Sequence, residues 1–337
     1  MDNTDALLRV EGIRKFFPVY SGFFNKVSGH LHAVDDVSFR IQRGETLGLV
    51  GESGCGKTTL GKMLVRAYPA TGGKVFFKDE SGVETEILSM KEGRFRPMRK
   101  NFQMIFQDPQ SSLDPRMTVY DIISEPILAG KLLKQGPELE ERVRELAQHV
   151  GLRVEHLRRY PHAFSGGQRQ RIGIARALST MPKLIVADEA VSSLDVSVQA
   201  QVLNLLKELQ QEFNLTYLFV AHSLSVIKHL CNRVAVMYLG KIVEMSDTLG
   251  VYDTPAHPYT EALLSAAPVP EPGGKRERII LYGDPPTPLN PPPGCRFQSR
   301  CRYAKDVCSK TEPLLVPVSP SHMVACHRLG ELTLRGV

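Results

Sequence analysis

The residues with the most specific chemistry form a glycine-rich octapeptide, Gly51-Glu-Ser-Gly-Cys-Gly-Lys-Thr. It matches G-x-x-x-x-G-K-[ST], follows an apolar strand at Thr46–Val50 and precedes a helix that begins near Thr59. In this setting, glycines let backbone N–H groups turn inward around nucleotide phosphates, and the helix N-terminus adds its positive end. Lys57 would place a positive charge on the phosphates, and Thr58 a hydroxyl on Mg²⁺. We therefore expect ATP and Mg²⁺ to contact the residues Gly51, Ser53, Gly54, Cys55, Gly56, Lys57, Thr58 and Thr59.

Two adjacent acids, Asp188 and Glu189, follow an apolar run that begins at Leu184. Ligands of open parallel sheets collect at the carboxyl ends of the strands, so the pair is expected near the phosphates. Asp188 is suited to holding Mg²⁺, directly or through water. Glu189 could orient and deprotonate the attacking water, and such a general base contributes about 10²–10⁴-fold in rate. The plain alternative is a solvated acid pair.

A second phosphate-binding pattern, Phe164-Ser-Gly-Gly-Gln-Arg-Gln-Arg, lies between the octapeptide and the acid pair. It resembles the signature sequence of ABC ATPases, and it places small residues before a helix whose N–H groups could face an anion. The resemblance implies that this patch caps the γ-phosphate held by an opposite subunit. The contacts supplied in trans would come from Ser165, Gly166, Gly167 and Gln168.

Further landmarks of ABC ATPases follow in order, and they narrow a choice that the octapeptide alone leaves open to kinases, GTPases, helicases and motors. Gln107 resembles the glutamine that senses Mg²⁺ and water and touches the membrane subunit. Asp195 lies in a D-loop-like Ser-Leu-Asp, also expected to act in trans, and His222 resembles the switch histidine at the γ-phosphate. The resemblance implies catalytic roles for Lys57, Gln107, Glu189 and His222. Phe17, with Phe16 as the alternative, is placed like the aromatic residue that stacks on adenine, although a phenylalanine in an N-terminal strand is more often core.

The resemblance extends to the ATPases of dipeptide and oligopeptide importers. It is carried by Pro18–Leu31, Phe106–Arg116, Leu194–Leu203, His257–Thr260 and Asn290–Cys301. It implies an ATPase that energises peptide import, with an oligosaccharide or nickel as the alternative solute. The implied partners are a second, paralogous ATPase subunit, two membrane permeases and an extracytoplasmic binding protein. A non-transport ABC ATPase, or a regulatory half with a degenerate ATP site, is the rival interpretation.

Two positions depart from the importer pattern. Ala190 stands where the family usually has proline after the acid pair, and Ser223 where it usually has aspartate after the switch histidine. Neither change removes a catalytic group, so we expect competence to be kept and the turnover rate to be altered.

Four cysteines near the C-terminus have the spacing C-x5-C-x6-C-x17-C: Cys295, Cys301, Cys308 and Cys326. Such a cluster favours a metal over disulfides in a cytosolic chain, and four thiolates could hold Zn²⁺ or a [4Fe–4S] cluster. Free thiols or disulfides are the alternative. His322 or His327 could replace one cysteine in a zinc site. The importer resemblance implies the iron–sulfur cluster, in a structural or redox-sensing role.

Short β-branched runs alternate with helical patterns along the chain. This alternation predicts an α/β fold with a mostly parallel sheet, which would position the residues named above. Strands are expected at Ala33–Phe39, Leu47–Val50, Leu184–Ala187, Tyr217–Ala221 and Val234–Tyr238, and helices at Leu60–Tyr68, Arg169–Ser179 and Val198–Phe213. The resemblance adds an antiparallel β subdomain. We expect a nucleotide-binding domain over 1–255, with a helical subdomain at about 109–163, and a loop-rich extension over 256–337.

Composition agrees with a globular protein: of 337 residues, 42% are apolar and 23% are charged. The net charge of +6 is too small to indicate nucleic-acid binding. No apolar run reaches the length of a membrane span. We expect a soluble, peripheral protein at the cytoplasmic face of the inner membrane, held there by its permeases.

Overall fold

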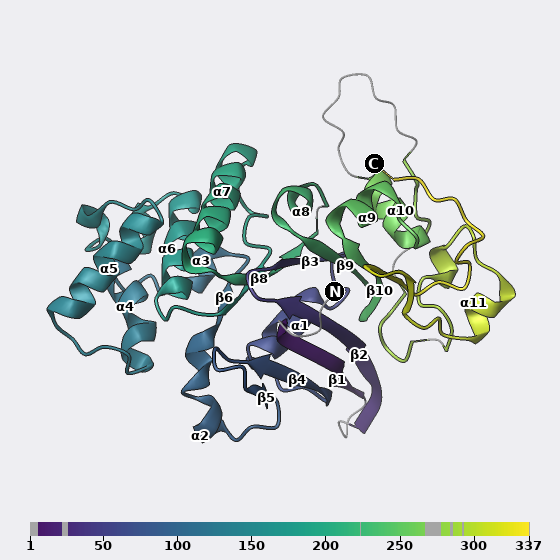
Figure 1. The fold of residues 1–337 in the computed structure, drawn as a ribbon, viewed down its shortest axis with the longest axis horizontal. Helices are drawn as coiled ribbons and strands as arrows, with labels where there is room; N and C mark the ends of the chain where they lie inside the picture. Colours follow the sequence, from purple (N-terminus) through teal and green to yellow (C-terminus); the bar gives the residue numbers. More distant parts are fainter. Residues whose placement is uncertain are drawn as a thin grey trace. The chain divides into compact units, whose positions relative to one another are not determined.

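The computed structural model describes residues 6–21, 26–222, 224–266, 278–283, 286–291 and 293–336. The chain divides into two compact units. The first, which we call the P-loop unit, comprises 1–42, 46–89 and 221–337, and the second, the helical unit, comprises 43–45 and 90–220. Figure 1 labels most of the helices and strands of the two units. Ser223, one of the two departures named above, lies outside the described residues.

The P-loop unit contains an antiparallel sheet in the order β2-β1-β4-β5. Its strands are β1 (Ala6–Ser21), β2 (Lys26–Gln42), β4 (Gly72–Lys78) and β5 (Glu84–Glu86). In the first half of β1, buried Leu8, Val10 and Ile13 alternate with more exposed residues, with a register shift after Val10. One face of this sheet is therefore core, as antiparallel sheets allow. The antiparallel β subdomain that the family resemblance implied is confirmed.

A second set of strands in the same unit has the order β11-β12-β10-β9-β3. These strands are β3 (Thr46–Val50), β9 (Arg233–Tyr238), β10 (Lys241–Asp247), β11 (Val316–Ser319) and β12 (His322–Val324). β3 and β9 are parallel, whereas β9, β10, β12 and β11 pair antiparallel. The C-terminal extension is thus hydrogen-bonded to the nucleotide-binding part through β10 and β12.

Helices of the P-loop unit are short. They are α1 (Lys57–Leu64), α8 (Leu224–Leu230), α9 (Thr248–Asp253), α10 (Pro258–Ser265), the 3₁₀ turn η4 (Gln298–Arg300) and α11 (Asp306–Lys310). α1 begins before the predicted Leu60 and ends before the predicted Tyr68. It ends early because Arg66 has the left-handed φ of 56° and Pro69 follows.

The helical unit is organised on three parallel strands in the order β8-β7-β6. They are β6 (Phe102–Ile105), β7 (Leu184–Asp188) and β8 (Thr216–Ala221). Every residue of β7 and β8 is buried. This burial explains their continuous apolar sequences, because parallel strands are commonly covered on both faces.

Helices fill the rest of this unit, and several have clear sequence causes. They are α2 (Glu92–Phe95), η1 (Met98–Asn101), α3 (Pro109–Ser112), α4 (Val119–Ala129), α5 (Pro137–His149), η2 (Val154–His156), η3 (Pro161–Ala163), α6 (Gly166–Leu178) and α7 (Val196–Phe213). α4 starts with a capping box between Thr118 and Asp121. α5 starts with Pro137 and buries Leu139, Val143 and Leu146, which repeat at helical spacing.

The predicted strands and helices are all present, and the α/β class is confirmed. Among the described residues, no helix has the length and apolar character that crossing a bilayer requires.

The loop-rich extension is held by aromatic packing and by hydrogen bonds to β10. Phe297 is buried, with ring centroids 5.2 Å from Tyr238, 5.3 Å from Tyr259 and 5.8 Å from His257. Buried Glu244 of β10 accepts hydrogen bonds from the backbone N–H groups of Ala256 and His257. The extension therefore shares the core of the nucleotide-binding part.

Candidate nucleotide site

The glycines of the octapeptide are required by close approach of other backbone. A side chain at Gly51 would overlap the carbonyl oxygen of Met237, and one at Gly56 would overlap that of Ala33. Gly56 also has φ 107° and precedes α1 without a side-chain cap. The first N–H groups of α1 are consequently not covered by a capping side chain, the arrangement that suits an anion.

Lys57 is buried and its ammonium is held by the loop itself. Its Nζ donates to the carbonyl oxygens of Gly51 at 2.7 Å and Glu52 at 2.9 Å. Cys55 is also buried, and burial raises the pKa of its thiol despite the nearby charge of Lys57. We interpret Cys55 as a packing residue of the loop, since a reactive cysteine needs a lowered pKa.

The other predicted contacts of the loop differ in exposure. Ser53 and Gly54 are exposed, whereas Thr58 and Thr59 are half-buried in the first turn of α1. His222, which also belongs to the P-loop unit, comes directly after β8 in the sequence and is exposed. Their roles at a nucleotide stay predictions.

The two candidate adenine-stacking residues have different neighbours. Phe16 stacks on His32 with ring centroids 4.0 Å apart. Phe17 is half-buried, meets Tyr68 edge-on at 6.2 Å and has the Lys15 ammonium 4.8 Å from its ring centroid. Because Phe16 is already stacked, its environment favours Phe17 as the ring left for a base.

In the helical unit, the structure brings Gln107 and Glu189 together. Gln107 Nε2 donates to Glu189 Oε2 at 2.8 Å. Asp188 is buried at the end of β7, and Glu189 has the left-handed φ of 48°, which is uncommon for a residue other than glycine. Its N–H donates to the carbonyl oxygen of Val220, and Ser192 Oγ donates to its carbonyl oxygen. The carboxylate expected to act as the base is thus positioned by backbone contacts and by Gln107.

The signature-like residues form an exposed helix start. Ser165 Oγ accepts from Gln168 N at 3.3 Å, and Gln168 Oε1 accepts from Ser165 N at 3.1 Å, so the pair is a capping box. Ser165 and Gly166 are exposed, and a side chain at Gly167 would overlap Val198. Asp195, at the start of α7, is exposed as well. The exposure of Ser165, Gly166 and Asp195 is compatible with contacts to a nucleotide held by a second subunit, and those contacts stay a prediction.

Ala190, the other departure, is buried directly after the acid pair. Nothing in the structure ties its methyl group to a change in turnover.

The four cysteines of the extension influence one another. Burial, together with the thiols of Cys301, Cys308 and Cys326, raises the pKa of Cys295 to about 11, although the N–H of Phe297 opposes the rise. Burial likewise raises the pKa of Cys301 and Cys326. These thiols accept backbone N–H groups, from Tyr303 and Arg328 respectively. The donor set has the softness that iron or zinc prefers.

The geometry fits less well than the chemistry. Within the described ranges, no group of three or more His, Cys, Asp or Glu side chains is arranged so that it could hold a metal ion. The histidines considered as substitutes have other partners: His322 Nε2 lies 2.7 Å from Glu244 Oε1, and His327 Nε2 lies 2.8 Å from the Thr311 carbonyl oxygen. The structure therefore does not support the expected [4Fe–4S] site.

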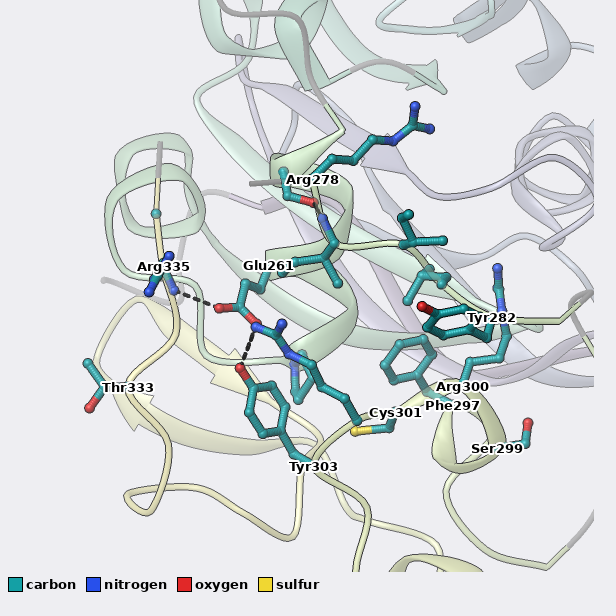
Figure 2. Close-up of a pocket in the computed structure, with 17 residues that line it drawn as sticks. Glu261, Arg278, Tyr282, Phe297, Ser299, Arg300, Cys301, Tyr303, Thr333 and Arg335 are labelled. Atoms are coloured by element: carbon teal, nitrogen blue, oxygen red, sulfur yellow. Dashed lines mark hydrogen bonds and ion pairs between the residues drawn. The ribbon is translucent and has the colours of Figure 1, made fainter. Parts of the chain in front are cut away.

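A cavity of about 830 Å³ lies beside the cysteine-bearing loop, and Figure 2 shows the residues that line it. Two of the guanidinium groups that line it have acidic partners. Arg302 contacts buried Glu261 at 3.2 Å, and Arg300 contacts Glu52 of the octapeptide at 2.7 Å. The contact between Arg300 and Glu52 was not predicted from the sequence, because no local pattern indicates an ion pair between residues 248 positions apart.

Comparison with known proteins identifies two family models. The model described as "ABC transporter" matches residues 34–192, and the model described as "Oligopeptide/dipeptide transporter, C-terminal region" matches residues 243–308. The chain is 52% identical over 328 residues to the oligopeptide transport ATP-binding protein AppF of Bacillus subtilis, covering 96% of this chain and 98% of that protein. It is 49% identical over 324 residues to a probable peptide ABC transporter ATP-binding protein, y4tS, of Sinorhizobium fredii, covering 96% and 90%.

Solved structures give the same fold. CbiO1 from Clostridium perfringens, part of the ABC transporter complex cbiONQ, is 25% identical with a TM-score of 0.60, over 73% of this chain and 90% of that one. The ATP-binding cassette MJ0796, solved as a dimer in a post-hydrolysis state with ADP and phosphate, is 23% identical with a TM-score of 0.61, over 72% and 98%. At that identity, the second likeness shows the fold alone.

Proposed function

We propose, from the premise that this chain belongs to the ATP-binding proteins of oligopeptide ABC transporters, that it hydrolyses ATP to drive the import of peptides. The observation that carries the proposal is the match along 96% of the chain to a relative named for oligopeptide transport. The match of residues 243–308 to a family model for the C-terminal region of oligopeptide and dipeptide transporters adds to it.

The loop residues support the binding of ATP in a specific way. Lys57 Nζ is held by two neutral carbonyl groups, of Gly51 and Glu52. A triphosphate would offer the ammonium anionic oxygens, and the attraction between opposite charges would add to the hydrogen bonding that the carbonyl groups already provide. Binding would therefore draw Lys57 from the loop to the phosphates. Thr58 would meet Mg²⁺, and the open start of α1 would meet the phosphates.

The acid pair supports hydrolysis. Asp188 would bind Mg²⁺ and Glu189 would take a proton from the attacking water. The hydrogen bond from Gln107 orients one carboxylate oxygen of Glu189. A base held in this way needs little rearrangement at the moment of reaction, which is what positioning contributes to a rate.

Partners follow from the exposed surfaces and from the family. We propose that the patch at Ser165–Gln168, together with Asp195, completes the ATP site of a second ATPase subunit, which is a paralogue. Two permeases would carry the peptide and hold this chain at the cytoplasmic face of the membrane, and an extracytoplasmic binding protein would deliver the peptide. Gln107 is the residue proposed to sense the permease contact.

Peptide import is separated from the alternative solutes by an uptake measurement. The chain is reconstituted in liposomes with the proposed partner ATPase and two permeases. ATP is supplied on the side of the ATPase subunits, and the binding protein and solute on the opposite side. We expect uptake of a labelled peptide that stops when Lys57→Ala is introduced, because the phosphates lose their charged partner. Uptake of nickel or an oligosaccharide, without peptide, would contradict the proposed solute and leave the ATPase assignment intact.

For the cysteines, we propose a bound [4Fe–4S] cluster, with Zn²⁺ as the alternative. The proposal rests on the soft donor set that four thiols offer and on backbone N–H groups directed at three of them. A cluster would cross-link the four segments that bear Cys295, Cys301, Cys308 and Cys326. The thiols would have to approach one another to bind it, since no metal-holding group exists among the described residues.

Iron, zinc and acid-labile sulfide are measured on protein purified without oxygen. Roughly four irons with four sulfides per chain would support the cluster, and about one zinc without sulfide would support the alternative. Absence of both metals would contradict the metal proposal, and the ATPase would be unaffected.

A further inference from the structure

The phosphate-binding loop is held from outside by the C-terminal extension, at Glu52. The backbone N–H of Glu52 donates to the hydroxyl of Tyr259 at 2.8 Å. Its carboxylate accepts two hydrogen bonds from Arg300, from Nη1 at 2.7 Å and from Nη2 at 3.2 Å. Such a two-point pairing between a guanidinium and a carboxylate fixes orientation as well as distance.

Arg300 is well shielded from water, which makes this ion pair different from an ordinary surface contact. Its side chain is 8% exposed, and that of Glu52 is 27% exposed. Burial alone would lower the pKa of Arg300, yet the hydrogen bonds to Glu52 and Tyr238 raise it overall. Loss of Glu52 would leave a buried guanidinium without its carboxylate, and such a loss is far more costly than the loss of an exposed pair.

The turn that carries Arg300 is set between two cysteines. The N–H of Gln298 donates to the carbonyl oxygen of Cys295 at 3.0 Å, and the N–H of Cys301 donates to that of Gln298 at 3.3 Å. Figure 2 shows Arg300, Phe297 and Cys301 together on one wall of the cavity. A change in the backbone around Cys295 or Cys301 would therefore move the guanidinium that holds Glu52.

Glu52 is also the residue that Lys57 contacts inside the loop. Its carbonyl oxygen accepts from Lys57 Nζ at 2.9 Å and from the N–H of Cys55 at 3.3 Å. One residue thus connects the ammonium expected to bind phosphate, the hydroxyl of Tyr259 and the guanidinium of Arg300. The shape of the loop depends on all three contacts.

We infer that Arg300 and Tyr259 are positioning residues for the ATP site, through which the cysteine-bearing extension sets the affinity for MgATP. The inference rests on the proposed binding of ATP at Gly51–Thr58. Arg300 and Tyr259 touch neither nucleotide nor water in this account. They hold Glu52, and Glu52 holds the loop in the form that receives phosphates. Couplings between sites are commonly worth about 5–150-fold in affinity.

A double-mutant cycle on the full chain tests the inference. The dissociation constant for MgATP, and kcat and KM for hydrolysis, are measured for wild type, Glu52→Gln, Arg300→Gln and the double variant. We expect each single variant to weaken binding by about 5–50-fold, with kcat changed less than KM. The double variant should bind no more weakly than Arg300→Gln alone, because the second change removes a partner that is already lost.

The matched control is Arg302→Gln, since Arg302 lies on the same cavity and pairs with Glu261 instead of the loop. It should leave the affinity for MgATP unchanged. Effects of Glu52→Gln and Arg300→Gln that simply add, singles that bind like wild type, or an equal loss in Arg302→Gln would overturn the inference. If Arg300→Gln does not fold, Glu52→Gln and Tyr259→Phe still decide, because wild-type affinity in both would overturn it. Wild-type protein that fails to bind MgATP would contradict the proposed function instead.

Discussion

The phosphate loop and the C-terminal extension belong to the same unit, but the conformation of the loop is determined mainly by nearby residues and that of the extension by residues distant in the sequence. The loop is determined locally: its glycines, Lys57 and the start of α1 fall within a dozen residues. The extension has little regular structure, and Phe297 and Arg300 are positioned by contacts with residues 38 to 248 positions away. Local chemistry can therefore be recognised from sequence, whereas the contacts that support it need the three-dimensional structure.

The largest expected effect comes from the aromatic anchor of the extension. Phe297→Ala removes a buried ring packed on Tyr238, Tyr259 and His257, and such a change costs about 3–5 kcal/mol. We expect the free energy of unfolding, measured by denaturant titration, to fall by that amount. Leu314→Ala is the control, because Leu314 is 76% exposed and its loss should cost less than about 0.5 kcal/mol. Equal effects for the two would show that the extension does not share the core.

A smaller effect concerns acid. Burial lowers the pKa of His257 to about 4, although the charge of Glu244 opposes this, whereas an unfolded histidine titrates near 6.5. Between these values the unfolded chain binds more protons, so stability is full above about pH 6.5 and falls as the pH drops toward 4, by at most about 1.4 kcal/mol per pH unit. Nδ1 of His257 also accepts the N–H of Tyr259 at the start of α10, which protonation would prevent.

The check is a series of unfolding curves between pH 4 and 8, for wild type and His257→Asn. Asparagine can still cap α10 and does not titrate. We expect the slope below pH 6.5 to be reduced in the variant. An unchanged slope would assign the acid sensitivity to other groups.

The smallest expected effect is on the affinity for MgATP, and it comes from the hydrogen bond that joins the phosphate loop to the extension. Tyr259→Phe keeps the ring but removes the hydroxyl that accepts the N–H of Glu52. A lost hydrogen bond is worth about 1 kcal/mol, so we expect the affinity for MgATP to fall about five-fold with little loss of fold. Tyr303→Phe, which removes a hydroxyl directed at Glu261, is the matched control and should bind like wild type. Titration calorimetry measures both.

Much of the fold could be predicted because its signals are short-range. The apolar runs predicted to begin at Leu184 and Tyr217 form the fully buried strands β7 and β8, and the Ser165–Gln168 pattern forms a capping box. The end of α1 was placed too late, since the left-handed conformation of Arg66 is not visible in residue types.

The supporting contacts could not be predicted, for a physical reason. The ion pair between Arg300 and Glu52 depends on how η4 packs against the loop, and no spacing in the sequence encodes it. The cysteines show that a recognisable residue pattern does not by itself establish the geometry of a site. Their residue type indicates a metal site. Among the described residues, however, no group of side chains is arranged so that it could hold a metal ion, although the other three thiols help to raise the pKa of Cys295.

Hydrolysis by Glu189→Gln tests the central claim most directly, because it isolates one oxygen of the residue assigned as the base. The variant is compared with Glu208→Gln, which changes an exposed glutamate of α7 in the same unit. We predict that Glu189→Gln binds MgATP with wild-type affinity while its rate of phosphate release falls by about 10²–10⁴-fold, and that Glu208→Gln hydrolyses normally. Undiminished phosphate release by Glu189→Gln would show that another group is the base and would contradict the account.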